Sequence, residues 1–109
     1  MTISVRESGA VHVVDVEGEV DLGTSPNLRR ALFDLLGKKP KLALNLRKLQ
    51  YIDSSGIATL IEVLKSAQGQ KMEFVLFGLS PAVQDAFRLT HVNRVFRIFE
   101  TEEQALIPA

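Results

Sequence analysis

The sequence predicts an α/β fold, in which helices pack against a mixed but mostly parallel β-sheet. The first observation behind this prediction is the length of 109 residues, which is typical of one domain. The second is that the chain begins with two segments rich in β-branched residues, after which helical and strand-like patterns alternate. Because parallel strands need crossover connections, this alternation favours a mostly parallel sheet. We expect residues 1–109 to form a single domain with the order ββαβαβαβα.

The first elements are expected to be a hairpin and a helix. Ile3–Arg6 and Val11–Glu17 are rich in β-branched residues and are separated by a Ser-Gly turn at residues 8–9. Ser25, as an N-cap, and Pro26, in the first turn, predict the start of a helix. Its apolar residues recur at helical spacing and are Leu28, Ala31, Leu32, Leu35 and Leu36.

The middle of the chain predicts a strand and a longer helix. Gly37 ends the first helix, and Leu42–Leu46 has leucine at alternate positions, as in a strand with one apolar face. A second apolar helical stripe then starts at about Ser54 or Ser55 and ends near Gly69.

The last third predicts two further strands and two helices. Met72–Phe77 is apolar apart from one glutamate, which is typical of a central strand covered on both faces. Ser80–Phe87 begins with a Ser-Pro capping signature and predicts a short helix. Val95–Phe99 is expected to be the last strand, and Thr101–Leu106 a terminal helix with a capping box.

The composition excludes several classes of function. Thirteen basic and thirteen acidic side chains give no net charge, so the uniform positive field of a nucleic-acid-binding protein is missing. The chain has no cysteine, which excludes disulfides and thiolate chemistry. The longest aliphatic or aromatic run, Phe74–Phe77, is far shorter than a membrane span, and the first residues do not resemble a signal peptide. We therefore expect a cytoplasmic protein without membrane insertion.

The loop at Gly18–Ser25 superficially resembles a phosphate-binding P-loop between a strand and a helix. However, Thr24 stands where the P-loop lysine would be, and Glu19 and Asp21 place two carboxylates where a polyphosphate would lie. An ordinary strand-to-helix turn is therefore the better interpretation, and no nucleotide cofactor is expected.

The loop at Ile52–Ile57 places a carboxylate and two hydroxyls at the start of a helix. One of Asp53, Ser54 and Ser55 is enough for an N-cap, so at least one hydroxyl is expected to be spare and exposed, with Gly56 having no side chain to shield it. From the residues alone, a simple cap and a functional serine both remain open.

Catalysis and metal binding are not expected. Neither serine has the glycine two positions earlier that a nucleophile elbow requires. His12 in a strand and His91 in a turn are the two histidines, and each is interpreted as structural or as a surface residue rather than as a general base. No group of residues has the spacing of metal ligands.

Charges are unevenly distributed along the chain. An acidic stretch before the first loop contains Asp15, Glu17, Glu19 and Asp21. A basic stretch follows and contains Arg29, Arg30, Lys38, Lys39, Lys41, Arg47 and Lys48. These residues form either ordinary solvated surface or a bipolar docking face for a charged protein.

Several motifs together resemble the STAS domain of bacterial anti-anti-sigma factors, also called anti-sigma factor antagonists. The motifs are Gly18–Asp21, Leu44–Leu46, Ile52–Gly56 and a closing segment with Leu89–Thr90, Val95–Phe99 and Glu102–Leu106. They cover nearly the whole chain in the family's order, and Asp-Ser-Ser-Gly at a strand-to-helix junction is the most specific of them. Asn45, where the family often has Asp, and His91, where Gly is usual, depart from the pattern.

The resemblance implies a phosphorylation-controlled binding switch in transcription regulation, with no catalysis of its own. Ser55 matches the serine that is phosphorylated by an anti-sigma factor with serine kinase activity. The unphosphorylated form binds that kinase and frees a sigma factor, and a PPM-type serine phosphatase resets the switch. The partner-binding residues expected from the resemblance are Asp21, Thr24, Asp53, Ser54, Ser55 and Gly56.

An alternative function uses the same fold without a kinase. The domain would then be a STAS subunit that docks constitutively in a larger complex, such as a lipid-transport ABC assembly or a stressosome-like scaffold. The sequence leaves open this alternative, the choice between Ser54 and Ser55, the identity of the sigma factor and the oligomeric state.

Overall fold

The computed structural model describes residues 1–107. Six strands and four helices form in this part of the chain. In order they are β1 (Thr2–Ser8), β2 (Val11–Val20), α1 (Ser25–Leu35), β3 (Lys41–Asn45), β4 (Leu49–Ile52), α2 (Ser54–Gly69), β5 (Glu73–Phe77), α3 (Pro81–Leu89), β6 (Arg97–Phe99) and α4 (Glu102–Leu106).

The strands form one mixed sheet in the order β1-β2-β3-β5-β6, and β4 pairs with the end of β2. β1 is antiparallel to β2, and every other pairing is parallel. The predicted α/β class and the mostly parallel sheet are therefore confirmed.

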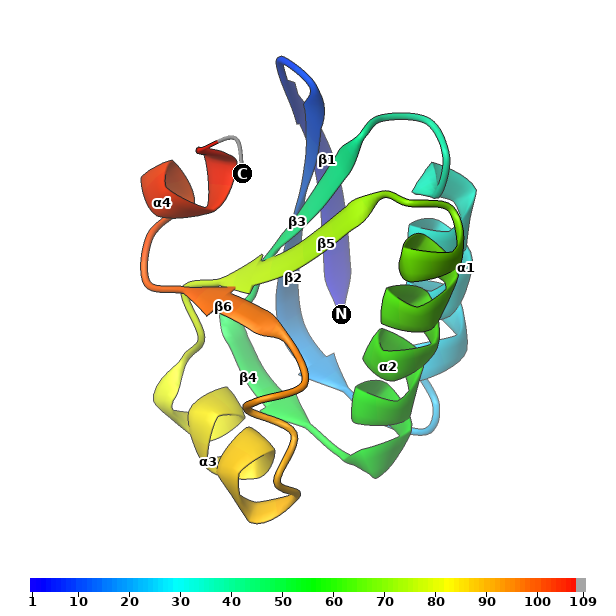
Figure 1. The fold of residues 1–109 in the computed structure, drawn as a ribbon. Coiled ribbons are helices and arrows are strands. Elements are labelled where there is room, and N and C mark those ends of the chain that lie inside the picture. The colour runs from blue at the N-terminus through cyan, green and yellow to red at the C-terminus, as the bar shows by residue number, and fades with distance from the viewer. Residues whose placement is uncertain (108–109) are drawn as a thin grey trace.

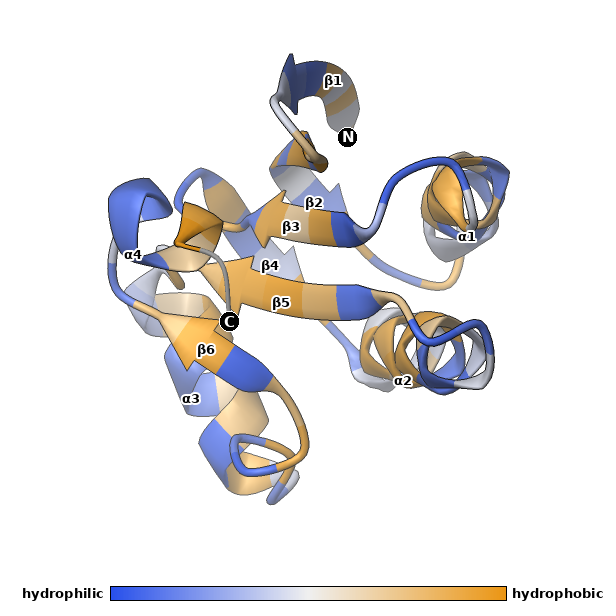
Figure 2. Ribbon diagram, turned by 45° about the horizontal axis from the view of Figure 1, so that its top comes forward, coloured by the Kyte–Doolittle hydropathy of each residue, from blue (hydrophilic) through white to orange (hydrophobic). Residues whose placement is uncertain are grey.

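Helices cover both faces of the sheet (Figure 1). α1 and α2 lie side by side on one face, α4 lies on the other, and α3 lies beside β4. The strongly apolar β3 and β5 run through the centre (Figure 2). The larger hydrophobic cluster includes Leu28, Leu44 and Leu60, whereas a smaller one joins Phe77 to Ala105 of α4.

The predicted order lacked β4, because its sequence gives no strand signal. Leu49 and Ile52 are buried while the two residues between them are exposed, a spacing of three that does not match strand alternation. The pairing of β2 shifts register between Gly18 and Glu19, beyond its last pairing with β3, and its final residues pair with β4. The correct order is ββαββαβαβα.

Two predicted element boundaries also need correction. The N-cap of α1 is Thr24 rather than Ser25, and no side-chain hydrogen bond caps this helix. The last strand begins at Arg97, two residues later than expected. The caps Ser80 of α3 and Thr101 of α4 are confirmed, because their hydroxyls accept hydrogen bonds from the N–H groups of Val83 and Gln104.

The described helices are also too short or too polar to cross a membrane.

Candidate functional site

The N-terminus of α2 is organised around the carboxylate of Asp53, which follows β4 in extended backbone. Its Oδ1 atom accepts hydrogen bonds from the backbone N–H groups of Ser55 at 3.0 Å and Gly56 at 3.1 Å. The Ser55 hydroxyl donates to the same oxygen at 2.5 Å. Asp53 is therefore the cap of α2, and Ser55 Oγ is fixed beside it.

The environment of Asp53 lowers the pKa of its carboxyl group. The Ser55 hydroxyl is the main cause, and the N–H groups of Gly56, Ser55 and Leu22 add to it, outweighing partial desolvation. All these partners are uncharged, so the ionised form is stabilised by oriented dipoles rather than by a cation. Asp53 remains ionised at neutral pH and is a weak proton acceptor.

The two serines differ in exposure. Ser54 is exposed, whereas Ser55 is half-buried and its hydroxyl is bonded to Asp53. The hydroxyl that is spare after capping is thus that of Ser54. Ser55 Oγ is held in one orientation at the first turn of the helix, where the helix dipole favours an anion.

Gly56 has a different role from the one its sequence context indicated. A Cβ atom at this position would lie 2.7 Å from Cγ1 of both Ile52 and Val20, which is too close for any real contact. The missing side chain therefore faces the core rather than the two hydroxyls. It allows the start of α2 to pack tightly against the ends of β2 and β4.

The loop between β2 and α1 lies next to the start of α2. The Asp21 carboxylate accepts hydrogen bonds from the N–H groups of Gly23 at 2.9 Å and Thr24 at 3.0 Å. The Thr24 hydroxyl accepts the N–H of Asp21 at 2.9 Å and donates to the Glu19 carbonyl at 3.1 Å. These bonds fix the loop and occupy the N–H groups of Gly23 and Thr24, which a P-loop would offer to a phosphate.

Backbone contacts connect the two loops. The Asp53 N–H donates to the Val20 carbonyl at 3.1 Å, two residues before Leu22, whose N–H helps to lower the pKa of the Asp53 carboxyl group. Asp21, Thr24, Asp53, Ser54, Ser55 and Gly56 consequently gather at the carboxyl ends of β2 and β4. This is the edge at which an open α/β sheet usually meets its ligands and partners.

The histidines lie away from this edge in different surroundings. His12 in β2 is 8% exposed, with Nε2 3.5 Å from a Glu7 oxygen and Nδ1 without a hydrogen-bond partner in residues 1–107. His91 is exposed and follows α3 with φ of 59°, a left-handed conformation that glycine adopts more easily. This conformation gives a physical reason for the glycine that is usual here in the family it resembles.

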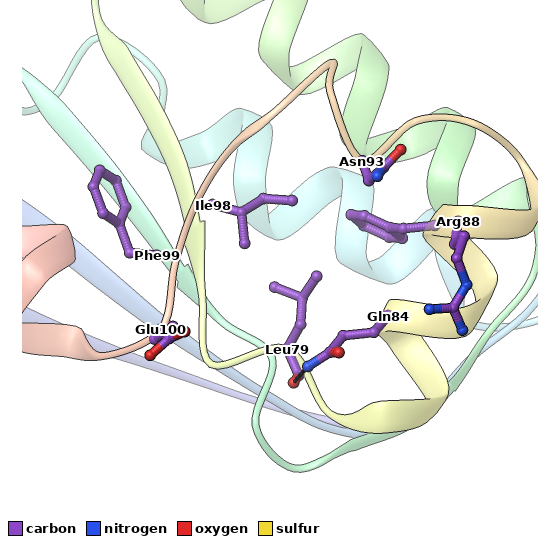
Figure 3. Close-up of a pocket in the computed structure, with 8 residues that line it drawn as sticks. Leu79, Gln84, Arg88, Asn93, Ile98, Phe99 and Glu100 are labelled. Carbon is purple, nitrogen blue, oxygen red and sulfur yellow. Dashed lines mark hydrogen bonds between the residues drawn. The ribbon is translucent and has the colours of Figure 1, made fainter.

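A cavity of about 420 Å³ lies between α3 and β6. Leu79, Phe87 and Ile98 form its apolar wall, and Arg88 and Glu100 lie at its polar border (Figure 3). Neither histidine and neither serine of the α2 start lines it. Within the described part of the chain, no three His, Cys, Asp or Glu residues are grouped as metal ligands would be.

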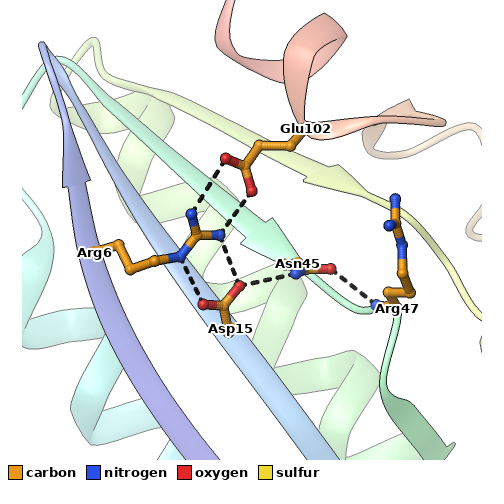
Figure 4. Close-up of polar contacts among 5 residues, drawn as sticks. All are labelled: Arg6, Asp15, Asn45, Arg47 and Glu102. Carbon is orange, nitrogen blue, oxygen red and sulfur yellow. Dashed lines mark hydrogen bonds and ion pairs between the residues drawn. The ribbon is translucent and has the colours of Figure 1, made fainter.

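A second polar cluster joins distant parts of the sequence and was not anticipated from it. Arg6 binds the Asp15 carboxylate through two nitrogens at 2.7 and 2.9 Å and the Glu102 carboxylate at 2.7 and 3.2 Å (Figure 4). Asn45 donates to Asp15 at 2.8 Å and accepts the Arg47 N–H at 3.0 Å. The amide of Asn45 can make both contacts, whereas an aspartate could not donate to Asp15.

Several charges of the two stretches are bound in separate contacts within the protein. Asp15 is bound by Arg6, and Asp21 by its own loop. Among the basic residues, Arg29 pairs with Glu62 at 3.0 Å. Lys41 is only 6% exposed and donates to a backbone carbonyl in the C-terminal segment.

The fold and the start of α2, which is capped by Asp53, define a small α/β domain whose candidate site is a pair of surface loops. Residues 2–105 match the sequence profile of the STAS domain. The chain therefore belongs to the STAS domain family.

Relatives with known names and structures are similar over nearly the full length. The chain is 30% identical over 104 residues to an anti-sigma-B factor antagonist of Listeria monocytogenes, covering 94% of this chain and 91% of the relative. It is 25% identical over 107 residues to the anti-sigma-F factor antagonist RsfB of Mycobacterium tuberculosis, covering 97% and 87%. The crystal structure of an anti-sigma factor antagonist from Mycobacterium paratuberculosis superposes with a TM-score of 0.88 at 27% identity, covering 96% and 90%.

Proposed function

We propose that this protein is a bacterial anti-sigma factor antagonist that acts in the cytoplasm as a phosphorylation-controlled switch in signal transduction. In its unphosphorylated form it binds an anti-sigma factor with serine kinase activity and thereby frees a sigma factor. The kinase phosphorylates Ser55, and a PPM-type serine phosphatase removes the phosphate. The names of the full-length relatives support the antagonist role.

The observation that carries the proposal is the fixed position of Ser55 Oγ in the first turn of α2. Its hydroxyl donates to Asp53, so its lone pairs are free to attack the γ-phosphorus of ATP held by the kinase. The new bond joins Oγ to phosphorus, and the bond to the departing ADP oxygen breaks. Because the pKa of Asp53 is lowered, this carboxylate orients the hydroxyl, and a base of the kinase takes the proton.

Phosphorylation at this position is expected to leave the fold intact. A phosphate adds a charge of about −1.5 to −2 at neutral pH. The helix dipole favours that charge, whereas repulsion from Asp53 opposes it in a solvated site. The two effects act in opposite directions at the surface of the molecule, outside the hydrophobic core.

Binding of a partner over the same phosphate has a larger energetic cost. Burying a dianion costs several kcal/mol unless the partner supplies a matching cation. A penalty of about 3–5 kcal/mol weakens binding by about 100- to 4,000-fold, because each 1.4 kcal/mol is a factor of ten. Phosphorylation is therefore expected to abolish the complex without unfolding the antagonist.

The test uses the purified protein, a candidate kinase-type anti-sigma factor from the same genome and ATP. We expect the wild type to bind the kinase and to gain one phosphate on Ser55, located by mass spectrometry of the modified peptide. Ser55→Ala should bind but not be phosphorylated, and Ser55→Asp should bind at least tenfold more weakly. Ser54→Ala is the matched control and should behave like the wild type.

Two results would contradict the proposal: Ser55→Asp binding as tightly as the wild type, or phosphate on another residue. Affinity capture that recovers an ATPase and a permease, with no phosphate on Ser55, would instead identify a constitutive subunit of a transport complex.

A further inference from the structure

Leu22, in the loop between β2 and α1, is 77% exposed. It belongs to neither hydrophobic cluster of the described residues, so packing of the core does not depend on it. Isolated exposed leucines are common on protein surfaces, and Leu89 at the end of α3 is 79% exposed. Exposure alone therefore does not distinguish Leu22, and its surroundings must be considered.

The backbone on both sides of Leu22 is fixed. Asp21 and Thr24 bind each other and the backbone of the loop through the hydrogen bonds described above, and the Ser25 N–H donates to the Asp21 carbonyl at 2.8 Å. The leucine side chain is thus presented to solvent by a rigid turn, and little conformational freedom remains to be lost on binding.

The position of Leu22 connects it to the proposed phosphorylation site. The Asp53 N–H donates to the carbonyl of Val20, two residues before Leu22, at 3.1 Å, and the Asp53 carboxylate accepts the Ser55 hydroxyl. Any partner that covers Ser55 closely therefore also meets the loop that carries Leu22. The acidic residues Glu19 and Asp21 precede this leucine, and no basic residue lies between Gly18 and Thr24.

We propose that Leu22 is the apolar anchor of the interface with the anti-sigma factor, and that it inserts into an apolar recess bordered by basic residues on that partner. This inference rests on the proposed function. The anchor also explains why a phosphate on Ser55 weakens binding of the partner. An apolar anchor beside Ser55 excludes water from the centre of the interface, so a phosphate there loses its hydration.

The test measures binding of Leu22 variants, without ATP, to the kinase-type anti-sigma factor that binds the wild-type protein, by isothermal titration calorimetry. Leu22→Ala should raise the Kd by about 10- to 100-fold, as truncation of a central anchor does. The heat-capacity change of binding should also become less negative, because less apolar surface is buried. Leu22→Met should remain within about threefold of the wild type, since it keeps an apolar side chain of similar volume.

Leu89→Ala is the matched control, because it removes an equally exposed leucine from a distant surface, and it should leave the Kd unchanged. Both alanine variants should unfold at the wild-type temperature. Wild-type affinity in Leu22→Ala, or an equal loss in Leu89→Ala, would overturn the anchor while leaving the proposed function intact. If Leu22→Ala weakens binding but Ser55→Asp does not, the anchor stands and the phosphorylation switch fails.

Discussion

Two carboxylates of this protein, Asp53 and Asp15, organise polar clusters in opposite ways. The partners of Asp53 are uncharged, and those within hydrogen-bond distance, Ser55 and Gly56, are only two and three residues away. Asp15 is bound by the charged Arg6, nine residues earlier, and by Asn45, thirty residues later. Through Arg6 the second cluster extends to Glu102, 96 residues from the arginine. The pKa of both carboxyl groups is lowered, but by different physical means.

The two clusters differ in their role: the Asp15 cluster joins elements of the fold, whereas the Asp53 cluster shapes the candidate site. The Asp15 cluster connects β1, β2, β3 and α4. The Asp15 oxygens accept hydrogen bonds from Arg6 and Asn45, and Arg6 also binds Glu102. The Asp53 cluster fixes one turn and leaves a hydroxyl oriented at the surface of the molecule. A phosphate added to Ser55 breaks no ion pair, because the hydrogen-bond partners of Asp53 are uncharged.

The largest loss of stability is expected from a substitution of Gly56, where the Asp53 cluster meets the hydrophobic core. Gly56→Ala places a methyl group 2.7 Å from Val20 and Ile52, so α2 must shift. We expect a loss of about 1–3 kcal/mol in the free energy of unfolding, measured by urea denaturation.

Gly69→Ala in the last turn of α2 is the matched control, because nothing lies within 4 Å of its added Cβ. It should stabilise the protein by up to about 1 kcal/mol, as alanine is the better helix former. A Gly56→Ala protein as stable as the wild type would mean that the close packing at this position is not required.

An intermediate effect is expected from breaking the long-range cluster. Arg6→Met leaves Asp15 and Glu102 without their shared cation and should lower the free energy of unfolding by about 1–2 kcal/mol at low salt. This loss should shrink in 1 M NaCl, where the screening length falls to about 3 Å.

Asp53→Ala provides the contrast, because its hydrogen-bond partners are neutral. It should lower the melting temperature by about 5 °C through loss of the cap, and by the same amount at both salt concentrations. An equal salt dependence of the two variants would remove the distinction between the clusters.

The smallest effect concerns pH. The folded pKa of Asp53 and of Asp15 lies below the unfolded value of about 3.9. The stability that each contributes is therefore complete well above pH 4 and is lost as the pH falls through the folded pKa. Between pH 7 and pH 3, Asp15→Asn and Asp53→Asn should each lose less stability than the wild type, as followed by urea denaturation at both pH values. A wild type that is as stable at pH 3 as at pH 7 would contradict this.

Part of the site could be predicted from sequence because it is local. A carboxylate and two hydroxyls before an apolar helical stripe indicate a helix start, and the structure assigns the cap to Asp53. The same reasoning failed for Gly56, because one of its two close neighbours, Val20, lies on β2, far from it in the sequence. It failed for β4 as well, because the burial of Leu49 and Ile52 depends on pairing with β2 after the register shift at Gly18.

The sequence by itself determined the α/β class, the helix starts that carry Pro or Asp-Ser signals, and the grouping of Asp53, Ser54 and Ser55 at the start of α2. These features depend on residues a few positions apart, whose contacts are set by backbone geometry. The tertiary structure alone decided that Arg6 meets Glu102, that α2 needs a glycine at position 56, and that the loop carrying Leu22 lies beside Asp53. Those contacts exist only once distant segments pack together, because no local pattern encodes which partner a side chain will meet across the sheet.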